Sequence, residues 1–390
     1  MTKTIPPMPE LRPERPYFSS GPTAKFPGWS LDKLKTDALG RSHRSSLGKG
    51  RLKYAIDLSR KILELPDDYL IGILPGSDTG ALECAMWNML GKGPATVAAW
   101  ESFGNVWIQD ATKQLKLKDL TVLEADYGQL PDLSNIGKDQ DLVFTWNGTT
   151  SGVRVPNADF IAADRTGVTI NDATSAIFAQ DMDWSKLDAT TYSWQKVMGS
   201  EAAHGMLILS PKAVERIESY DPEWPLPKLF RIKKKGKLDL SIFEGATINT
   251  PSMLANEDYI LALEWAESIG GLAALRARAD ANAAIVQNWI DATDWMVNMV
   301  ADPALRTNTG VCMKFTGDWY ESLPADKQAD VPKKIASMLE KMDIGYDFNG
   351  YRDAPPSLRI WCGSTVEQED VKRLLPWIEW AYAQVQAELS

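Results

Sequence analysis

Asp172 and Lys196 are residues whose types and settings suit chemistry on an aldehyde attached to a nitrogen-containing ring. Asp172 closes the strand-like run that begins at Val168, and Lys196 lies in the small polar turn 193–199. A lysine amine forms a Schiff base with an aldehyde, and a carboxylate keeps a pyridine nitrogen protonated so that the ring accepts electrons. The pair therefore predicts a pyridoxal phosphate (PLP) site. A loop lysine is more often simply solvated, so the other loops must support this prediction.

Ligand-binding residues of open α/β sheets gather at the carboxyl ends of strands, and this chain has suitable residues after several apolar runs. The turn 75–80, Pro-Gly-Ser-Asp-Thr-Gly, opens a helical pattern whose amides and dipole suit a phosphate. It lacks the Gly-Lys-Ser/Thr ending of a nucleotide P-loop. Phe103 offers an aromatic face to a flat ring, and Thr149 and Thr150 follow a further run. Taken singly, a helix cap or a core residue explains each of them; together they favour a PLP pocket.

The apolar runs have strand length and alternate with helical patterns. The runs are 70–74, 95–100, 142–145, 168–170 and 206–209, and the helical patterns between them include 80–90 and 106–115. Continuous apolar strands are typical of a mainly parallel sheet that is buried on both faces. The alternation predicts a doubly wound α/β fold.

The pattern changes after Pro251, which indicates a second domain. Helix-rich segments at 259–266 and 272–299 precede probable strands at 310–315 and 357–361 and a closing helix at 366–389. We expect a large PLP-binding domain over 17–254 and a smaller C-terminal α+β domain over 255–390. Residues 1–16 are rich in proline and are expected to run extended over the surface.

Composition bounds the location and the partners. Hydrophobic residues make up 44% of the 390 residues and charged residues 24%, as in ordinary globular proteins. No apolar run approaches the ~18 residues of a membrane span, and residues 1–9 lack a signal-peptide core. We therefore expect a cytoplasmic protein with no membrane partner. A net charge of −10 argues against a nucleic-acid partner. The basic run 228–237 is expected to be a solvated turn.

The cysteines and histidines exclude further classes of site. Cys84, Cys312 and Cys362 are widely separated and show no C-x-x-C spacing, so we expect reduced core residues and no metal site. The two histidines, His43 and His204, leave little room for a zinc hydrolase or a Ser-His-Asp triad.

A set of short motifs, spread from residue 18 to about 363, forms a family pattern. The motifs are Phe-Ser-Ser-Gly-Pro at 18–22, Ser-His-Arg-Ser at 42–45, the loop 76–80, Asn-Gly-Thr at 147–149, Asp172, Gln-Lys at 195–196, Asn-Thr-Pro at 249–251 and Leu-Arg at 358–359. With them the chain resembles the phosphoserine aminotransferases, class V members of the fold-type-I PLP enzymes. The first two motifs are quite specific to that family, whereas Gln-Lys is shared more widely.

The resemblance implies a seven-stranded, mainly parallel sheet between helices, a small C-terminal α+β domain and a homodimer with shared active sites. It makes Lys196 the Schiff-base residue and the proton shuttle between the substrate Cα and the cofactor C4′, with Asp172 as the partner of the ring nitrogen. Phe103 is implied to stack on the ring, where the family more often has tryptophan, and Thr149 to bind near the ring.

The phosphate and substrate residues are also implied by the resemblance. The cofactor phosphate would be held by Asp78, Thr79 and Gln195, and by Asn249 and Thr250 of the other subunit. Substrate would be held by residues of cationic type, which are Arg359 for the α-carboxylate and His43, Arg44 and Arg352 for the distal group.

Two departures from the family pattern concern the distal group. Thr79 stands where many members have arginine, and Tyr351 precedes Arg352 where members often have His-Arg. The change at Thr79 removes one cationic contact, so Arg352 is expected to take a larger part in recognising the distal group.

The resemblance implies transamination between glutamate and 3-phosphohydroxypyruvate in serine biosynthesis. A phosphorylated four-carbon analogue, used in vitamin B6 biosynthesis, is a second route in the family. The alternatives are another class V aminotransferase acting on alanine, serine or glyoxylate, a cysteine desulfurase, and a non-catalytic scaffold. An apolar strand around Cys312 disfavours the desulfurase, and the presence of both Lys196 and Asp172 disfavours the scaffold.

Overall fold

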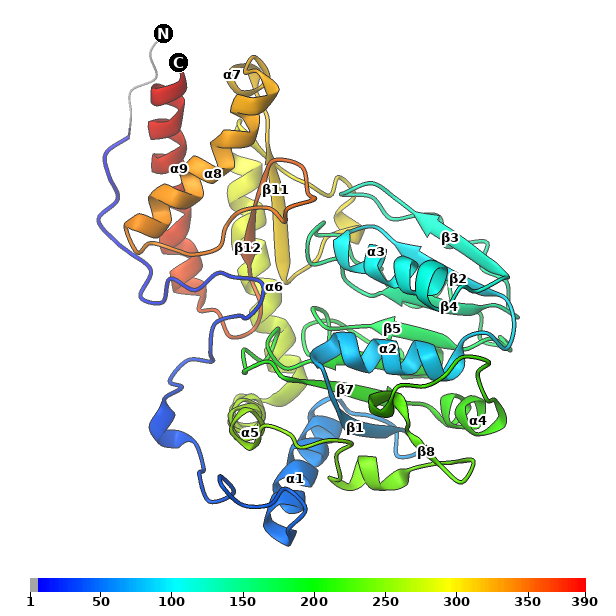
Figure 1. The fold of residues 1–390 in the computed structure, drawn as a ribbon. Helices are drawn as coiled ribbons and strands as arrows, with labels where there is room; N and C mark the ends of the chain where they lie inside the picture. The colour runs from blue at the N-terminus through cyan, green and yellow to red at the C-terminus, as the bar shows by residue number, and fades with distance from the viewer. Residues whose placement is uncertain (1–5) are drawn as a thin grey trace.

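The computed structural model describes residues 6–390, and a seven-stranded mixed sheet lies at its centre (Figure 1). The strands are β1 Leu70–Pro75, β2 Ala95–Ala99, β3 Leu120–Glu124, β4 Asp141–Thr145, β5 Thr169–Asp172, β6 Ala189–Ser193 and β7 His204–Leu209. Their order in the sheet is β1-β7-β6-β5-β4-β2-β3. Strands β3, β2, β4, β5 and β6 run parallel to one another, and β7 runs antiparallel to both of its neighbours, β6 and β1. The prediction of a mainly parallel sheet is confirmed.

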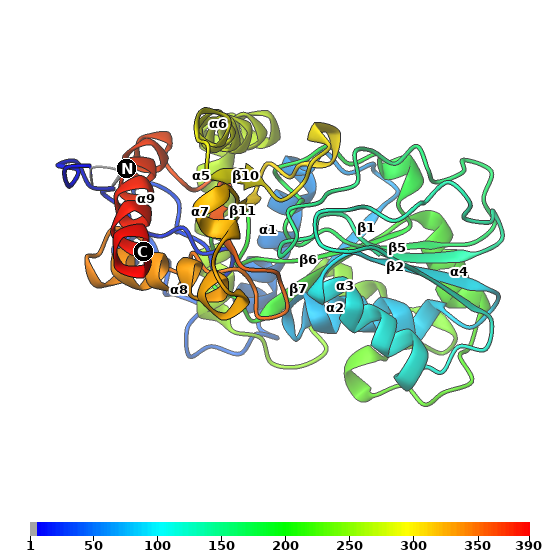
Figure 2. The ribbon, with the colours of Figure 1, turned by 90° about the horizontal axis from the view of Figure 1, so that it is seen from above.

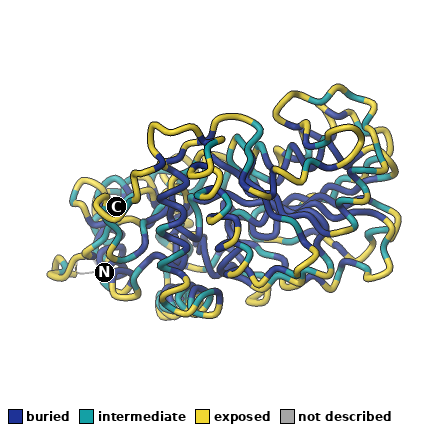
Figure 3. Tube along the Cα trace, turned by 90° about the horizontal axis from the view of Figure 1, so that it is seen from below, coloured by how far each residue is buried: buried dark blue, intermediate teal, exposed yellow. Residues whose placement is uncertain are grey.

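Both faces of the sheet are buried, because successive side chains point to opposite sides of a strand. In β4, Phe144 joins one hydrophobic core and Val143 the other; in β7, Ile208 and Leu207 divide in the same way. Figure 3 shows the strands buried and the connecting loops largely exposed. The continuous apolar runs of the sequence follow from this two-sided burial.

Helices cover the two faces. Along one face lie α2 Ser77–Met89, α3 Ser102–Gln109 with its π-helical extension Asp110–Gln114, and α4 Pro211–Ser219. On the other side α1 Ser46–Ile62 packs against α5 Met253–Ser268. Figure 2 shows α2 and α3 on one side of the sheet and α1 on the other. The expected helices at 80–90 and 106–115 are thus present, each beginning a few residues earlier.

A three-stranded antiparallel sheet forms the core of the C-terminal part. It consists of β10 Met296–Asn298, β11 Gly310–Phe315 and β12 Ser357–Trp361, surrounded by α6 Gly271–Ala292, α7 Asp318–Glu321, α8 Ala325–Lys341 and α9 Gln368–Leu389. The predicted strands 310–315 and 357–361 are confirmed. The prediction of helix over 272–299 is wrong beyond Ala292, because Met296 pairs with Phe315 as an edge strand.

Short elements complete the chain. They are the 3₁₀ turns Leu31–Lys33, Trp184–Lys186, Lys228–Phe230, Leu240–Glu244 and Pro303–Leu305, and the strands β8 Lys233–Lys234 and β9 Lys237–Leu238. Strands β8 and β9 form a surface hairpin from the basic run, and its lysines pair with Asp221, Asp239 and Glu218. The prediction of a solvated turn there is confirmed.

The N-terminal segment runs beside α9 and then crosses to the large sheet (Figure 1). The Glu14 amide donates to Asp370 Oδ1 at 2.7 Å. The Trp361 amide donates to the Phe18 carbonyl at 3.1 Å, and the Thr23 amide donates to the Gln195 carbonyl at 2.9 Å. The segment therefore connects the C-terminal part of the molecule to the turn after β6. Residues 1–5 of the expected extended region lie outside the described residues. Over residues 6–390, no helix has the length and apolar content needed to cross a membrane.

Candidate active site

A cavity of about 270 Å³ lies at the edge of the large sheet where the parallel strands end. The strand-end loops predicted to carry ligand-binding residues all reach it. The predicted residues that line it are Asp78, Thr79, Phe103, Thr149, Asp172, Gln195 and Lys196. Their roles remain predictions, but the fold brings seven of the predicted residues into one cavity from five separate loops.

The Lys196 amine lies inside this cavity in contact with the N-terminal segment. Its Nζ donates to the Ser20 carbonyl at 2.6 Å and lies 5.8 Å from the centre of the Phe103 ring. A Cβ on Gly21 would lie 2.5 Å from this Nζ, so a larger residue there would force the lysine side chain to move. Burial, and then the charge of Arg359, lower the pKa of Lys196 to about 8. A substantial neutral fraction of the amine, the nucleophilic form, is therefore present near neutral pH.

Asp172, at the end of β5, is buried and receives two N–H donors. The Thr174 amide donates to Oδ1 at 3.0 Å, and Trp107 Nε1 donates to Oδ2 at 3.4 Å. Hydrogen bonds of this kind favour the ionised carboxylate. The sequence reasoning missed Trp107, although it lies four residues after Phe103 and therefore on the same face of α3.

The start of α2 has the geometry expected of a phosphate-binding helix start. Gly76 precedes the helix in the left-handed conformation, with φ of 86°, and no side chain caps the first turn. The amides of a first helical turn lack intrahelical partners and attract anions. Gln195 approaches this turn, with Nε2 donating to Ser77 Oγ at 3.4 Å.

The polar lining of the cavity fits PLP. Several of its buried oxygen atoms have no hydrogen-bond partner among the described residues, namely Asp78 Oδ1, Thr145 Oγ1, Thr174 Oγ1, Ser193 Oγ and Gln195 Oε1. Buried polar atoms are normally paired, so these atoms indicate a polar ligand. These residues could hold a phosphate at the helix start, a ring against Phe103 and a ring nitrogen at Asp172.

The position of the Asp78 side chain differs from the one that its expected role requires. The resemblance gives both its backbone and its side chain to the phosphate. In the structure the Asp78 backbone lies in the first turn of α2 as expected. Its carboxyl lies beside the carboxyl of Asp172 and the hydroxyls of Thr174 and Thr191. Burial, and then the Asp172 charge, raise the pKa of Asp78 well above its usual value.

Two of the predicted substrate cations lie near the cavity. Arg359, on β12, donates from Nη1 to the Thr149 carbonyl at 3.4 Å, and its buried Nε has no partner among the described residues. The side chain of Arg352 is 80% exposed, in a loop that reaches the cavity through Tyr351, whose ring lies 5.4 Å from that of Phe103. Arg359 is thus close to the Lys196 amine, and Arg352 is at the mouth.

The other predicted residues lie outside the cavity of their own chain. His43 is buried just before α1 with Nε2 unpartnered among the described residues, and burial followed by the Arg44 charge lowers its pKa. Arg44, Asn249 and Thr250 are exposed. The family resemblance implies that Asn249 and Thr250 bind in the site of a second subunit, and both residues are exposed on the surface of the single chain.

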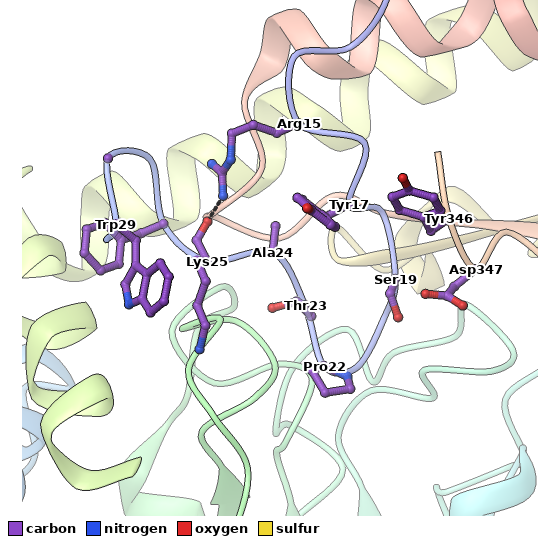
Figure 4. Close-up of a pocket in the computed structure, with 12 residues that line it drawn as sticks. Arg15, Tyr17, Ser19, Pro22, Thr23, Ala24, Lys25, Trp29, Tyr346 and Asp347 are labelled. Carbon is purple, nitrogen blue, oxygen red and sulfur yellow. Dashed lines mark hydrogen bonds between the residues drawn. The ribbon is translucent and has the colours of Figure 1, made fainter. Parts of the chain in front are cut away.

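A larger cavity, of about 700 Å³, lies beside the N-terminal segment and shares only Pro22 with the first (Figure 4). Its basic side chains are engaged already. Arg15 donates to the Lys25 carbonyl, and Lys25 pairs with Asp258 and Glu201 at 2.7 Å each. Among residues 6–390, the two basic side chains of this cavity are therefore not free for an anionic substrate, in spite of its size.

The cysteines are buried and unpaired in the described chain, as predicted. Cys312 lies in β11, and burial raises its pKa to about 12. A cysteine desulfurase needs an exposed thiolate nucleophile. The buried position of Cys312 excludes that role for it.

The curated relatives of the chain share one name. No model of a protein family matches the chain. A protein of Methanosarcina barkeri named phosphoserine aminotransferase is 54% identical over 95% of this chain and 97% of its own length. One of the same name from Methanosarcina mazei is 53% identical with the same coverage.

Solved structures share the fold. A phosphoserine aminotransferase from Cytophaga hutchinsonii has a TM-score of 0.78 at 23% identity, covering 94% of this chain and 98% of that one. A PLP-bound phosphoserine aminotransferase from Trichomonas vaginalis has 0.75 at 18%, covering 94% and 99%. An alanine–glyoxylate aminotransferase from Nostoc scores 0.74 at 16%, covering 97% of each chain. Fold likeness therefore does not separate these activities, whereas the two Methanosarcina relatives do.

Proposed function

The chain belongs to the phosphoserine aminotransferase family, a family of PLP-dependent aminotransferases, and from that premise we propose the reaction and the residues that carry it. The reaction is transfer of the amino group from glutamate to 3-phosphohydroxypyruvate, giving 3-phosphoserine and 2-oxoglutarate in serine biosynthesis. The observation that supports the site best is the cavity that contains both Lys196 and Asp172, with Arg359 beside it.

PLP, when bound, supplies a carbonyl group that accepts amines and a ring that accepts electrons. The chain is proposed to hold the phosphate at the first turn of α2 with Thr79 and Gln195, and to cover the ring with Phe103. Asp172 keeps its negative charge against the ring nitrogen, supported by its two N–H donors. Thr149 lines the same cavity beside the ring.

Lys196 is proposed to be both the attachment point and the base of the reaction. Its lowered pKa, about 8, lets the free amine take a proton from the substrate Cα at neutral pH. The Ser20 carbonyl holds the amine in place by the 2.6 Å hydrogen bond. The same acceptor is available when the amine is protonated, so the lysine does not leave the cavity between proton transfers.

Cationic residues are proposed to bind the two ends of the substrate. Arg359 offers its unpartnered Nε and its Nη groups to the α-carboxylate, a pairing that is usually bidentate. Arg352, at the mouth, is proposed to bind the distal phosphate or the glutamate side chain, together with His43 and Arg44 of a second subunit. With Thr79 in place of an arginine, Arg352 carries more of that recognition.

A homodimer is proposed because several large hydrophobic side chains are exposed on the elements around α1 and α5, close in the chain to the exposed residues Asn249 and Thr250. Large hydrophobic side chains are exposed on α1, on the start of α5 and in the segment before α1, namely Leu31 at 69%, Leu39 at 37%, Leu47 at 36%, Tyr54 at 36% and Leu254 at 50%. Such a group on neighbouring elements indicates a surface that another protein covers. A second copy would bring Asn249 and Thr250 to the phosphate of the facing site.

Subunit mixing tests the shared site. Inactive Lys196→Ala protein, mixed with an inactive Asn249→Ala/Thr250→Ala variant and allowed to exchange subunits, should regain about a quarter of wild-type activity. Half of the dimers are then mixed, and each holds one intact site. The control combines all three substitutions in one chain and mixes that chain with Lys196→Ala, which should give no recovery. No recovery in the first mixture, after exchange is verified, would show that each subunit builds its own site.

A panel of amino acceptors tests the reaction itself. With glutamate as donor, 3-phosphohydroxypyruvate should exceed pyruvate and glyoxylate in kcat/KM by about 100-fold, equivalent to roughly 2.7 kcal/mol, because only it places a dianion against the distal cations. The phosphorylated four-carbon analogue belongs in the panel as a test of the proposed second route, to vitamin B6. A preference for glyoxylate, or for alanine or serine as donor, would replace this proposal with the alternative class V activity.

The division of the chain and its location are also proposals. The boundary between 17–254 and 255–390 is supported by the separate sheets, although α5 packs against α1 of the first part. A cytoplasmic location is supported by the three unpaired cysteines, which suit a reducing compartment.

A further inference from the structure

The cavity contains a second carboxyl group that the proposed reaction does not use. Asp78 is 7% exposed, and its Oδ1 has no hydrogen-bond partner among residues 6–390. The carboxyl lies beside that of Asp172, with the hydroxyls of Thr174 and Thr191 as its other near polar groups. Two carboxylates held together away from water are not both ionised without a large energetic cost, so such a pair tends to share one proton.

The surrounding donors decide which carboxyl keeps that proton. Asp172 accepts from the Thr174 amide at 3.0 Å and from Trp107 Nε1 at 3.4 Å, and both donors favour its ionised form. Asp78 has no N–H donor among residues 6–390: its Oδ1 is unpartnered, and its nearest possible donors are the hydroxyls of Thr174 and Thr191, which favour the ionised form less strongly than the burial and the Asp172 charge oppose it. The proton is therefore more stable on Asp78, whose raised pKa agrees with the geometry.

We propose that Asp78 holds the single proton of an Asp78–Asp172 pair and donates it to Asp172 as a hydrogen bond, which makes Asp78 a positioning residue for Asp172. The inference rests on the proposed function, because Asp172 is there the partner of the cofactor ring nitrogen. The Asp78 side chain is thereby assigned to the ring-nitrogen end of the site, whereas the family resemblance assigned it to the phosphate end.

The charged groups around the cavity agree with a neutral Asp78. Arg359 on β12 and Glu101, which caps α3, act on the Lys196 amine together with Asp78 and Asp172. With Asp78 neutral, two basic groups face two carboxylates. The neighbouring His204, at the start of β7, accepts from the Ser252 amide and so carries no proton on Nε2.

Cofactor titrations with and without the phosphate test the assignment. Cofactor-free wild type, Asp78→Asn and Asp78→Ala are titrated with PLP and with pyridoxal, which lacks the phosphate, and the Kd is read from the absorbance change. Asp78→Asn keeps a donor toward Asp172 and should stay within about threefold of wild type for both compounds. Asp78→Ala loses the donor and should weaken both by the same factor, about tenfold, the usual cost of a hydrogen bond to a charged group.

A variant at the phosphate end is the control. Thr79→Ala should weaken PLP binding and leave pyridoxal binding unchanged. If Asp78→Ala weakened PLP alone, Asp78 would belong to the phosphate cradle and the inference would be overturned. If Asp78→Asn lost as much affinity as Asp78→Ala, the negative charge of Asp78 would be what supports cofactor binding. That result would overturn the assignment of a proton to Asp78. Failure of the wild type to take up PLP would instead overturn the proposed function.

The stability of the cofactor-free protein gives a readout that is independent of binding. When folding raises the pKa of a carboxyl, the contribution of that carboxyl to the free energy of unfolding falls as the pH rises. The fall takes place between its unfolded pKa, about 3.9, and its folded pKa. Asparagine does not titrate, so the free energy of unfolding of Asp78→Asn, relative to wild type, should increase over that pH range. A difference that does not change with pH would overturn the proton assignment.

Discussion

Lys196→Ala is expected to abolish transamination, by at least about 10⁴-fold, while the cavity still binds PLP. The lysine is proposed as both attachment point and base, and a positioned general base alone contributes about 10²- to 10⁴-fold. The phosphate cradle of α2 and the Phe103 face do not depend on the lysine, so binding remains. Single-turnover kinetics and absorbance titration measure the two effects separately.

Labelling identifies the lysine directly. Borohydride treatment of the PLP-loaded wild type should leave the cofactor on the peptide that contains Lys196. Because burial lowers the pKa of Lys196 to about 8, the rate of PLP uptake by cofactor-free protein should rise with pH and level off above about 8. Lys235→Ala, in the exposed hairpin of the basic run, serves as the matched control and should behave as wild type. A label on any other lysine would refute the assignment.

Asp172→Asn is expected to lower turnover by about 10³-fold without loss of the fold. The two side chains have the same shape, so the fold should persist, although the asparagine NH2 cannot accept one of the two hydrogen bonds from Thr174 and Trp107. Loss of the negative charge removes the electrostatic partner of the ring nitrogen, an effect of the size seen when a preorganised charge-stabilising group is removed. The measurements are kcat with glutamate, together with the thermal midpoint of the cofactor-free variant.

The outcome for Asp172 bears on Asp78 as well. Near-normal turnover of Asp172→Asn would mean that another carboxyl holds the ring nitrogen. Asp78 is the other carboxyl that lines the cavity within the described residues, so the double variant Asp78→Asn/Asp172→Asn would then be needed to lose activity.

The sheet was largely predictable because its strands are buried on both faces, which leaves continuous apolar runs in the sequence. Strand β6, Ala-Thr-Thr-Tyr-Ser, escaped prediction because its buried residues are mostly polar and form no apolar run. The end of α6 was misplaced because the segment around Trp295 and Met296 is as apolar as the helix before it. This segment forms β10, which pairs with β11, and a pairing between residues far apart in the chain leaves no pattern in the local sequence.

The residues of the cavity were predictable one by one, since each follows a strand and the carboxyl ends of parallel strands meet. Contacts between side chains were not. The position of Asp78 beside Asp172, and of Trp107 above it, depends on how α2 and α3 pack on the sheet. His43, Arg44, Asn249 and Thr250 lie outside the cavity of their own chain, so a single chain does not bring them together with Lys196.

The N-terminal segment has a consequence for how the protein is made. A ribosome synthesises the residues around Ser20 early, yet Trp361 and Asp370, which hold that segment in place, emerge late. Until then the Ser20 segment has its contact with the turn after β6, through Thr23 and Gln195, but lacks its contacts with the C-terminal part, even though every strand of the large sheet has already been translated. A nascent chain is therefore expected to form the sheet first and to capture its cofactor only near the end of synthesis.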